Sequence, residues 1–366
     1  MTTRRNFLKS AGSLGGLVFC GCGLPWEAHA QQVSQARLPV MVKGKRIKTI
    51  DTHAHCFFQE AIDLMGEDAK NVPPPVKGVK EHFIVIDQRL KEMDAMAIDM
   101  EILSINPFWY RKDRDVAQKI CEVNNEKLAE LCGKNPDRFA AFASLPMQAP
   151  DLAAQMLETA VKKQGLKGAA IGGSVLGDDF ARDRFHPVLK KAEELGAVLY
   201  IHPQSTPQLG ERLKGNGWLS NTIGNPLDTT IALQHLIFEG TLDKFPGLKV
   251  LAAHGGGYLP SYKMRGDHAC FVSPQSCNPN VVLKKKPSEY VNQLYFDAMV
   301  FSGEGLRHLV SQVGVTQLML GTDHPIPWET APVDHVMGTP ISDDEKAAIL
   351  GLNAAKLFGI KTDGAG

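Results

Sequence analysis

Short apolar runs, each bounded by glycine, proline or polar residues, recur along the chain from residue 47 to residue 321. Strands that are covered on both faces read as continuous apolar segments of this length, without alternation of polar and apolar positions. We therefore predict eight strands, at Ile47–His53, Met100–Ile105, Phe139–Leu145, Gly168–Ile171, Val198–His202, Leu248–His254, Leu294–Met299 and Gln317–Gly321.

The segments between these runs have apolar residues at helical spacing, most clearly at 115–134, 151–164 and 343–358. The second of these helices is expected to begin with Asp151 as its N-cap, directly after Pro150. Eight strands that alternate with helices predict an α/β fold of the (β/α)8 or TIM-barrel type. We assign residues 31–366 to this barrel as one domain, which begins with a leader or extended arm from about Gln31 to Lys45.

The connection after the first strand, from about Cys56 to Lys80, is longer than most connections in compact domains. Long loops over a barrel mouth tend to be functional segments that cover the site. We therefore expect this connection to act as a lid.

The amino-acid composition limits the kinds of molecule that the protein is expected to bind. The 366 residues include 40 Lys+Arg and 40 Asp+Glu, so the formal net charge is zero. A chain without basic excess is not expected to bind nucleic acid. The hydrophobic share of 43% and the charged share of 22% are ordinary for a soluble globular protein. Function must therefore be sought in particular residues.

Residues 1–30 have the pattern of an export signal. Arg4 and Arg5 precede Phe-Leu-Lys, an apolar stretch of residues 11–24 follows, and Ala28-His29-Ala30 is a small-x-small cleavage site. This segment resembles a twin-arginine signal, whereas a membrane anchor would need a longer stretch with less glycine. We expect a periplasmic protein that the twin-arginine machinery exports in its folded state.

The seven cysteines do not form a regular framework. Cys20 and Cys22 lie in the export signal, and the five that remain have no even spacing that would indicate a set of disulfides. One bridge, between Cys270 and Cys277, is left open as a suggestion.

Histidines and one aspartate stand at the carboxyl ends of four predicted strands. His53 and His55 end the first strand, His202 the fifth, His254 the sixth and Asp323 the eighth. Residues i and i+2 of a strand face the same side, so the first two imidazoles are expected to project together. Because barrel active sites lie at the C-terminal ends of the strands, we expect all of these side chains to meet.

Three imidazoles and one carboxylate are a donor set that suits Zn²⁺ or a similar divalent ion. The strand ends supply that set and one further histidine, which can act as an acid or a base beside a metal. We therefore predict a site for one metal ion.

The motifs around these residues resemble those of the amidohydrolase superfamily. More narrowly, the chain resembles the branch around 2-amino-3-carboxymuconate-6-semialdehyde decarboxylase, over nearly the whole mature chain. The stretches that carry the resemblance are Asp51–His55, His202-Pro203, Ala253–Gly257 and Gly321–Pro325, together with Arg89–Asp94, Ser144–Pro150 and Lys244–Val250.

The resemblance implies a role for each strand-end residue. His53, His55, His202 and Asp323 would hold one metal ion, usually Zn²⁺, with Mn²⁺ or another divalent ion as the alternative. His254 would activate a metal-bound water or transfer a proton, and Asp323 would also orient that water. Arg265 would bind a substrate carboxylate, in the family often across a dimer interface, which implies a homodimer.

One departure separates this chain from the named decarboxylase. That enzyme has a second carboxylate-binding arginine in the connection after strand one, whereas the corresponding stretch here, residues 75–82, contains Lys77 and Lys80 but no arginine. Lysine attracts a carboxylate but cannot hold it bidentately. The resemblance therefore extends to the branch and not to the named substrate.

We expect a metal-dependent, non-oxidative decarboxylase of a small aromatic or unsaturated carboxylic acid, with His254 as the proton-transfer residue. Phe108, Trp109 and Tyr110 follow the second strand and could form an aromatic wall, with Trp109 contacting substrate, or could pack the barrel mouth. The alternatives are a hydrolase of a lactone, ester or amide on the same scaffold, and a non-catalytic metal-binding protein. The further histidine argues against the last.

Four other residues near the strand ends receive lesser roles. Asp51 is expected to orient a ligand or to cap the strand end, and Asp297 to contact a metal ligand from behind. His324 is expected to face away from the site, and Cys56 has no neighbour in the sequence that would activate a thiolate.

Overall fold

The computed structural model describes residues 39–72, 83, 86–204, 207–277 and 280–362. The predicted export signal and most of the predicted arm lie outside these residues. The end of the arm is a hairpin, in which strand β1 (Val40–Val42) pairs antiparallel with β2 (Lys45–Ile47). Lys43 and Gly44 both have positive φ, of 50° and 75°, as the tightest hairpin turns require. The first barrel strand consequently begins at Ile50 and not at Ile47.

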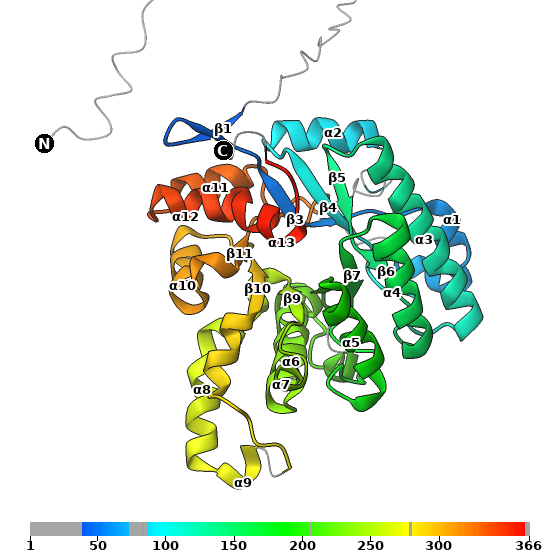
Figure 1. Ribbon diagram of the computed structural model, residues 1–366, viewed down its shortest axis with the longest axis vertical. Helices are drawn as coiled ribbons and strands as arrows, with labels where there is room; N and C mark the ends of the chain where they lie inside the picture. The colour runs from blue at the N-terminus through cyan, green and yellow to red at the C-terminus, as the bar shows by residue number, and fades with distance from the viewer. Residues whose placement is uncertain (1–38, 73–82, 84–85, 205–206, 278–279, 363–366) are drawn as a thin grey trace, which may run out of the picture. The chain divides into compact units, whose positions relative to one another are not determined.

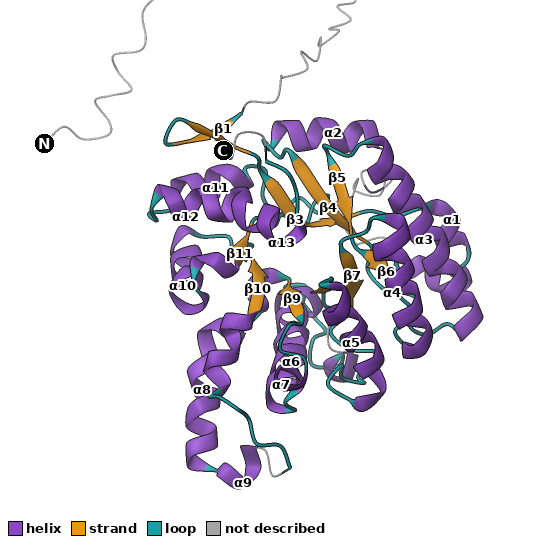
Figure 2. Cartoon of the chain, viewed as in Figure 1, coloured by secondary structure: helices purple, strands orange, loops and turns teal. Residues whose placement is uncertain are grey.

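The barrel strands follow the predicted order and all neighbours are parallel. One sheet has the order β3-β4-β5 and the other β6-β7-β8-β9-β10-β11 (Figures 1 and 2). Their bounds are β3 (Ile50–His55), β4 (Met100–Ser104), β5 (Phe139–Ala141), β6 (Ala143–Ser144), β7 (Gly168–Ile171), β8 (Val198–Ile201), β9 (Lys249–Ala252), β10 (Leu294–Asp297) and β11 (Leu318–Met319).

Two junctions join these sheets into one closed barrel. β5 and β6 flank Phe142, whose N–H donates to the carbonyl of Leu103 at 2.9 Å, so the two segments serve as one strand. On the other side, the N–H of Thr52 donates to the carbonyl of Leu320 at 2.9 Å. The N–H of Asp323 donates to the carbonyl of His53 at 2.7 Å. The fold is therefore the predicted TIM barrel.

Helices surround the strands in both views (Figures 1 and 2). Their bounds are α1 (Gln59–Asp63), α2 (Ile86–Ala95), α3 (Arg114–Lys134), α4 (Pro150–Gln164), α5 (His186–Leu195), α6 (Asn225–Phe238), α7 (Thr241–Lys244), α8 (Leu259–Val272), α9 (Pro274–Cys277), α10 (Gly303–Val313), α11 (Pro332–Gly338), α12 (Asp343–Ala347) and α13 (Asn353–Phe358). Among the helices of the described residues, none is long and apolar enough to span a bilayer.

The N-terminus of α4 differs from the prediction. Its N-cap is Ala149, and Pro150 occupies the first helical turn, where a missing N–H costs no hydrogen bond. Asp151 is therefore inside the helix and does not cap it. Its carboxylate instead pairs with the guanidinium of Arg114 at 2.5 Å.

The barrel interior is packed with side chains and is not a channel. Phe142 stacks on Tyr200 with ring centroids 5.1 Å apart, and Phe358 of α13 packs edge-on against Phe142 at 5.6 Å. Ile102, Leu251 and other strand residues complete this cluster, and all are buried. Apolar packing therefore fills this part of the barrel interior.

Helix α8 extends away from the strands and leads into α9 (Figure 1). The suggested disulfide is present here, between Cys270 and Cys277, whose Cα atoms are 4.9 Å apart. This hairpin exposes large apolar side chains, including Tyr262, Phe271 and Val272.

Candidate metal centre

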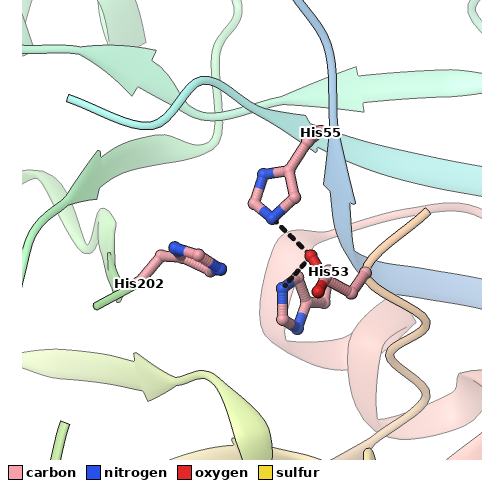
Figure 3. Close-up of side chains that lie close together, drawn as sticks. His53, His55 and His202 are labelled. Atoms are coloured by element: carbon pink, nitrogen blue, oxygen red, sulfur yellow. Dashed lines mark ion pairs between the residues drawn. The ribbon is translucent and has the colours of Figure 1, made fainter. Parts of the chain in front are cut away.

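Four buried side chains converge at the carboxyl ends of the strands (Figure 3). His53 and His55 lie on β3, His202 follows β8 directly, and Asp323 follows β11. One potential ligand atom from each lies within 4.8 Å of the others. Oδ1 of Asp323 is 2.8 Å from Nε2 of His55 and 3.2 Å from Nε2 of His53. The barrel therefore assembles the four residues predicted as ligands.

The backbone turns sharply at two of the site residues. His254 and Asp323 both have left-handed φ values, of 55° and 60°, which are uncommon for side chains other than glycine. After His254 the chain must also pass close to its neighbours: a Cβ on Gly256 would lie 2.5 Å from the ring of Phe296. The glycines that follow His254 therefore permit the turn that places its imidazole over the barrel.

Hydrogen bonds fix the orientation of His53. Its Nδ1 lies 2.7 Å from Oδ2 of Asp297, and both side chains are fully buried. Asp297 also accepts the N–H groups of His254 and Gly255, each at 2.8 Å. Burial opposes its charge, but the bond to His53 keeps the pKa of Asp297 below its ordinary value. A charged Asp297 accepts the proton on Nδ1 of His53, so Nε2 is the ring atom that faces the cluster and can bind a cation once its own proton has left.

A serine performs the same task for His55. Oγ of Ser104 lies 2.8 Å from Nδ1 of His55 and donates its own proton to the carbonyl of Ala54 at 3.1 Å. Because that hydroxyl proton is used, the serine oxygen accepts from Nδ1–H of His55. Nε2 of His55 is thereby left to face Asp323.

The hydrogen bonding of His202 shows whether the cluster fits a cation. Neither of its ring nitrogens has a hydrogen-bond partner among the described residues, although the side chain is buried. Burial lowers the pKa of His202 well below its ordinary value, so the ring is neutral and carries a free lone pair. Buried donors and acceptors without a partner are rare in proteins, and a bound metal ion would give one nitrogen of His202 a partner. The residues fit a divalent cation.

The cluster attracts positive charge as it stands. Burial opposes the charged form of His53, but the carboxylates of Asp323 and Asp297 outweigh this and raise the pKa of that imidazole to about 10. A cation bound to Nε2 would take the place of this proton. The indole of Trp328 donates to the second oxygen of Asp323 at 2.7 Å, so Oδ1 is the atom left for a cation.

His254 lies beside the cluster. Its ring centroid is 5.0 Å from that of His53 and 5.3 Å from that of His202. Burial lowers the pKa of His254 to about 4, and its Nδ1 has no hydrogen-bond partner in the described part of the chain. The imidazole is therefore uncharged at neutral pH, and a nitrogen without a partner among the described residues lies beside the cluster.

Asp51 and His324 hold the barrel together behind the site. Asp51 accepts the hydroxyl of Thr322 at 2.5 Å and the N–H of His53 at 2.9 Å, and so joins β3 to the end of β11. His324 contacts Glu101 at 2.6 Å and Glu92 at 2.9 Å, on the side away from the cluster.

A cavity of 390 Å³ opens over the cluster. His55, His202 and Asp323 form one part of its lining. Aromatic side chains form part of its walls, and two ring pairs are stacked, Phe57 with Phe83 and Trp218 with Trp328. Phe57, Asp68, Val72 and Phe83 come from the long connection after β3, so its described part borders the cavity. Residues 73–80 of the predicted lid lie outside the described residues, and its closure stays a prediction.

Of two residues expected at the substrate, Trp109 is placed elsewhere, and the role of Arg265 across a dimer interface stays a prediction. Trp109 is fully buried and donates its indole N–H to the carbonyl of Leu145 at 2.9 Å, so it packs the loop after β4 while its neighbour Phe108 lines the cavity. Its size and ring favour this buried packing. Arg265 lies on α8, is exposed, and does not line the cavity of its own chain.

Sequence reasoning missed several residues that the barrel brings to the site. Ser104 is the last residue of β4 and could have been noticed as a strand-end side chain. Trp328 and Arg111 lie in loops, and Asp228 lies in the first turn of α6; no motif points to them. All but Ser104 line the cavity.

The fold and the site define a class, the (β/α)8 barrels that carry a metal site of three histidines and one aspartate at the strand ends. Residues 50–360 match the model of a family described as amidohydrolase. The chain belongs to the amidohydrolase family.

Its relatives include several decarboxylases. It is 32% identical over 278 residues to 2-amino-3-carboxymuconate-6-semialdehyde decarboxylase of Dictyostelium discoideum. This match covers 75% of this chain and 76% of the relative. The crystal structure of 5-carboxyvanillate decarboxylase from Sphingomonas paucimobilis superposes with a TM-score of 0.80 and 26% identity, over 86% of this chain and 100% of that one. The crystal structure of dihydroxybenzoic acid decarboxylase from Polaromonas sp. JS666, with manganese and the inhibitor 2-nitroresorcinol bound, superposes with a TM-score of 0.75 and 26% identity. The match covers 86% of this chain and 97% of that one.

Proposed function

We propose that the protein is a metal-dependent, non-oxidative decarboxylase of a small aromatic carboxylic acid. The observation that carries this proposal is the buried cluster of His53, His55, His202 and Asp323 beneath an aromatic cavity. The relatives add chemical support, because the decarboxylases to which the chain is similar include enzymes named for aromatic acids.

The four clustered residues would hold one divalent cation. Such a cation supplies a Lewis acid that stabilises negative charge on substrate oxygen atoms. Zn²⁺ suits three imidazoles and one carboxylate, and Mn²⁺ is the alternative, since the relative from Polaromonas contains manganese. The bonds from Asp297 and Ser104 hold the two histidines of β3 in the tautomers that present Nε2.

His254 would move the proton that the reaction requires. Decarboxylation breaks the bond from carbon to the carboxylate: CO₂ leaves, the electron pair stays on carbon, and that carbon takes up a proton, which solvent water supplies and His254 would relay. The imidazole of His254 lies beside the cluster and has a nitrogen without a partner among the described residues. General acid–base groups in such positions accelerate reactions by about 10²–10⁴-fold.

The cavity walls would bind and orient the planar ring. Phe57 stacked on Phe83 and Trp218 stacked on Trp328 offer flat apolar faces, which favour an aromatic substrate. Asp323, fixed by the indole of Trp328, would in addition orient a water or substrate oxygen beside the cation.

A homodimer would account for Arg265. This residue is exposed on α8 and does not line the described cavity over the cluster, so we propose that it binds a substrate carboxylate in a second copy. The exposed apolar residues of the α8–α9 hairpin support such an interface. A dimer in which both subunits carry Arg265→Ala should then have lower activity than the wild type. Size-exclusion chromatography with light scattering measures whether the protein is a dimer.

Export through the twin-arginine machinery remains part of the proposal, on the pattern of residues 1–30. Periplasmic fractionation of cells that express the full chain, compared with Arg4→Lys/Arg5→Lys, tests it. Retention of the variant in the cytoplasm is the expected result.

The activity is tested with a panel of benzoic acids that carry hydroxyl, methoxy or second carboxyl groups. CO₂ release by the Zn²⁺- and Mn²⁺-loaded proteins is the expected outcome. A parallel panel of lactones, esters and amides tests the hydrolase alternative. Turnover in the second panel alone would replace the proposal, and turnover in neither would favour a metal-binding role.

A further inference from the structure

Arg111 is the one basic residue other than histidine among the described residues that line the cavity, and its side chain is exposed to solvent. Arg111 lies in the loop between β4 and α3. This loop is anchored on both sides of it. The indole of Trp109 donates to the carbonyl of Leu145 at 2.9 Å, and the amide of Gln148 donates to the carbonyls of Trp109 and Lys112 at 2.9 Å and 3.2 Å. The guanidinium is therefore carried on a fixed backbone at the cavity.

The carboxylates that line the cavity already have partners of their own. Asp323 faces His53 and His55. Asp68 pairs with the ammonium of Lys112 at 2.6 Å, a residue outside the lining, and Arg111 adds only a weaker, longer-range attraction to it.

Asp228 is the third acidic residue of the lining. It accepts the N–H of Gln204 at 3.1 Å and packs so tightly on Gly173 that a Cβ there would lie 2.3 Å from its oxygen. No hydrogen bond or ion pair joins Arg111 to any residue that the structure describes. Its charge is thus available to a ligand.

The cavity consequently has two separate positive centres when a cation is bound. The cation is one, because Asp323 is the anionic member of the four ligands and the charged Asp297 lies behind His53 and not in the cavity lining, and Arg111 is the other. Aromatic side chains form much of the lining that these two centres share. An aromatic ligand that carries an anionic group toward each centre would match this distribution of charge, whereas a monoanion would leave one centre without a partner.

We infer that Arg111 determines substrate specificity, by binding a second anionic group of the aromatic acid, and that the substrate class is therefore an aromatic dicarboxylate. The inference rests on the proposed function for the role of the first carboxylate. A guanidinium holds a carboxylate through two parallel hydrogen bonds, which a lysine cannot do.

The test measures binding, so that it is independent of catalysis. Calorimetric titration of the metal-loaded protein with benzoate and with benzene-1,2-, 1,3- and 1,4-dicarboxylate gives four affinities. We expect at least one dicarboxylate to bind about 10-fold or more tightly than benzoate, the equivalent of one charge-assisted pair. Arg111→Gln should reduce that ratio to about one, and Arg111→Lys should keep part of it.

Arg114→Gln is the matched control, because Arg114 lies three residues further along, pairs with Asp151 at the surface and does not line the cavity. Its ratio should equal that of the wild type. The inference is overturned if no dicarboxylate is preferred, if Arg111→Gln leaves the ratio unchanged, or if that variant weakens benzoate and dicarboxylate equally. Failure of every acid to release CO₂ would instead overturn the proposed function and leave these affinities to be judged separately.

Discussion

Nδ1 of His53 lies 2.7 Å from Oδ2 of Asp297, in a pair from which solvent is excluded on both sides. Asp297 is not in the metal-ligand cluster, yet it sets which nitrogen of His53 carries the proton. Asp297→Asn should therefore weaken metal binding about 10–100-fold, the range found when such supporting carboxylates are removed. Competition against a fluorescent chelator measures the affinity. Asp243→Asn, which removes a carboxylate that accepts the hydroxyl of Tyr290, is the control for a general loss of stability.

His202→Ala should abolish binding of the metal ion, because the variant removes one of four ligands and leaves the rest unable to complete the set. Elemental analysis of the purified protein should find about one metal ion per chain in the wild type and much less in the variant. The same measurement identifies the metal as zinc or manganese. His235→Ala, which changes a half-exposed histidine on α6, should keep the wild-type content. Metal retained by His202→Ala would refute the ligand assignment.

His254→Ala should lower kcat by about 10²–10⁴-fold while the metal content stays at the wild-type level. The reason is that His254 lies beside the cluster without belonging to the set of four. Steady-state kinetics and metal analysis on the same preparation separate the two effects. A variant that loses its metal together with its activity would assign His254 to the ligands.

Arg89→Met should destabilise the fold by about 3–5 kcal/mol, the range for removing one partner of a buried ion pair. The side chain is fully buried, donates to Glu101 at 2.7 Å and also to the carbonyl of His55. Its loss leaves the charge of Glu101 in the barrel wall with His324 as its remaining partner. Urea unfolding measures the free energy, and Arg114→Gln, which breaks an exposed pair, should change it little.

Asp228 predicts a change of stability with pH. Burial raises the pKa of its carboxyl from 3.8 to about 6 in the folded protein. The folded state therefore binds this proton more tightly than the unfolded chain, so the group favours folding increasingly as the pH falls from about 6 to about 4 and opposes it at neutral pH. The amide in the Asp228→Asn variant cannot ionise, so the variant lacks this pH-dependent contribution to the free energy of folding. The stability of the variant relative to the wild type should be higher at pH 7.5 than at pH 4.5, and a difference that does not change with pH would contradict the assignment.

The order of elements and of the metal-site residues could be predicted from the sequence. In a parallel barrel the carboxyl ends of all strands meet at one mouth, so His53, His202 and Asp323 could be brought together without knowledge of any contact. Buried strands are also continuous in hydrophobicity, which made them visible. The predictions failed where a local pattern had two solutions, as at Ile47, where a hairpin strand and a barrel strand both accept an apolar residue.

The sequence by itself therefore determined the barrel, the cluster and the histidine beside it, because these depend on strand order and on residue type. Only the tertiary structure decided what surrounds them. It buried Trp109 against Leu145, brought Ser104 behind His55, and left Arg111 at the cavity without a partner among the described residues. Such outcomes depend on which side chains from distant loops fill the same space, and packing between segments far apart in sequence has no periodicity along the chain from which it could be predicted.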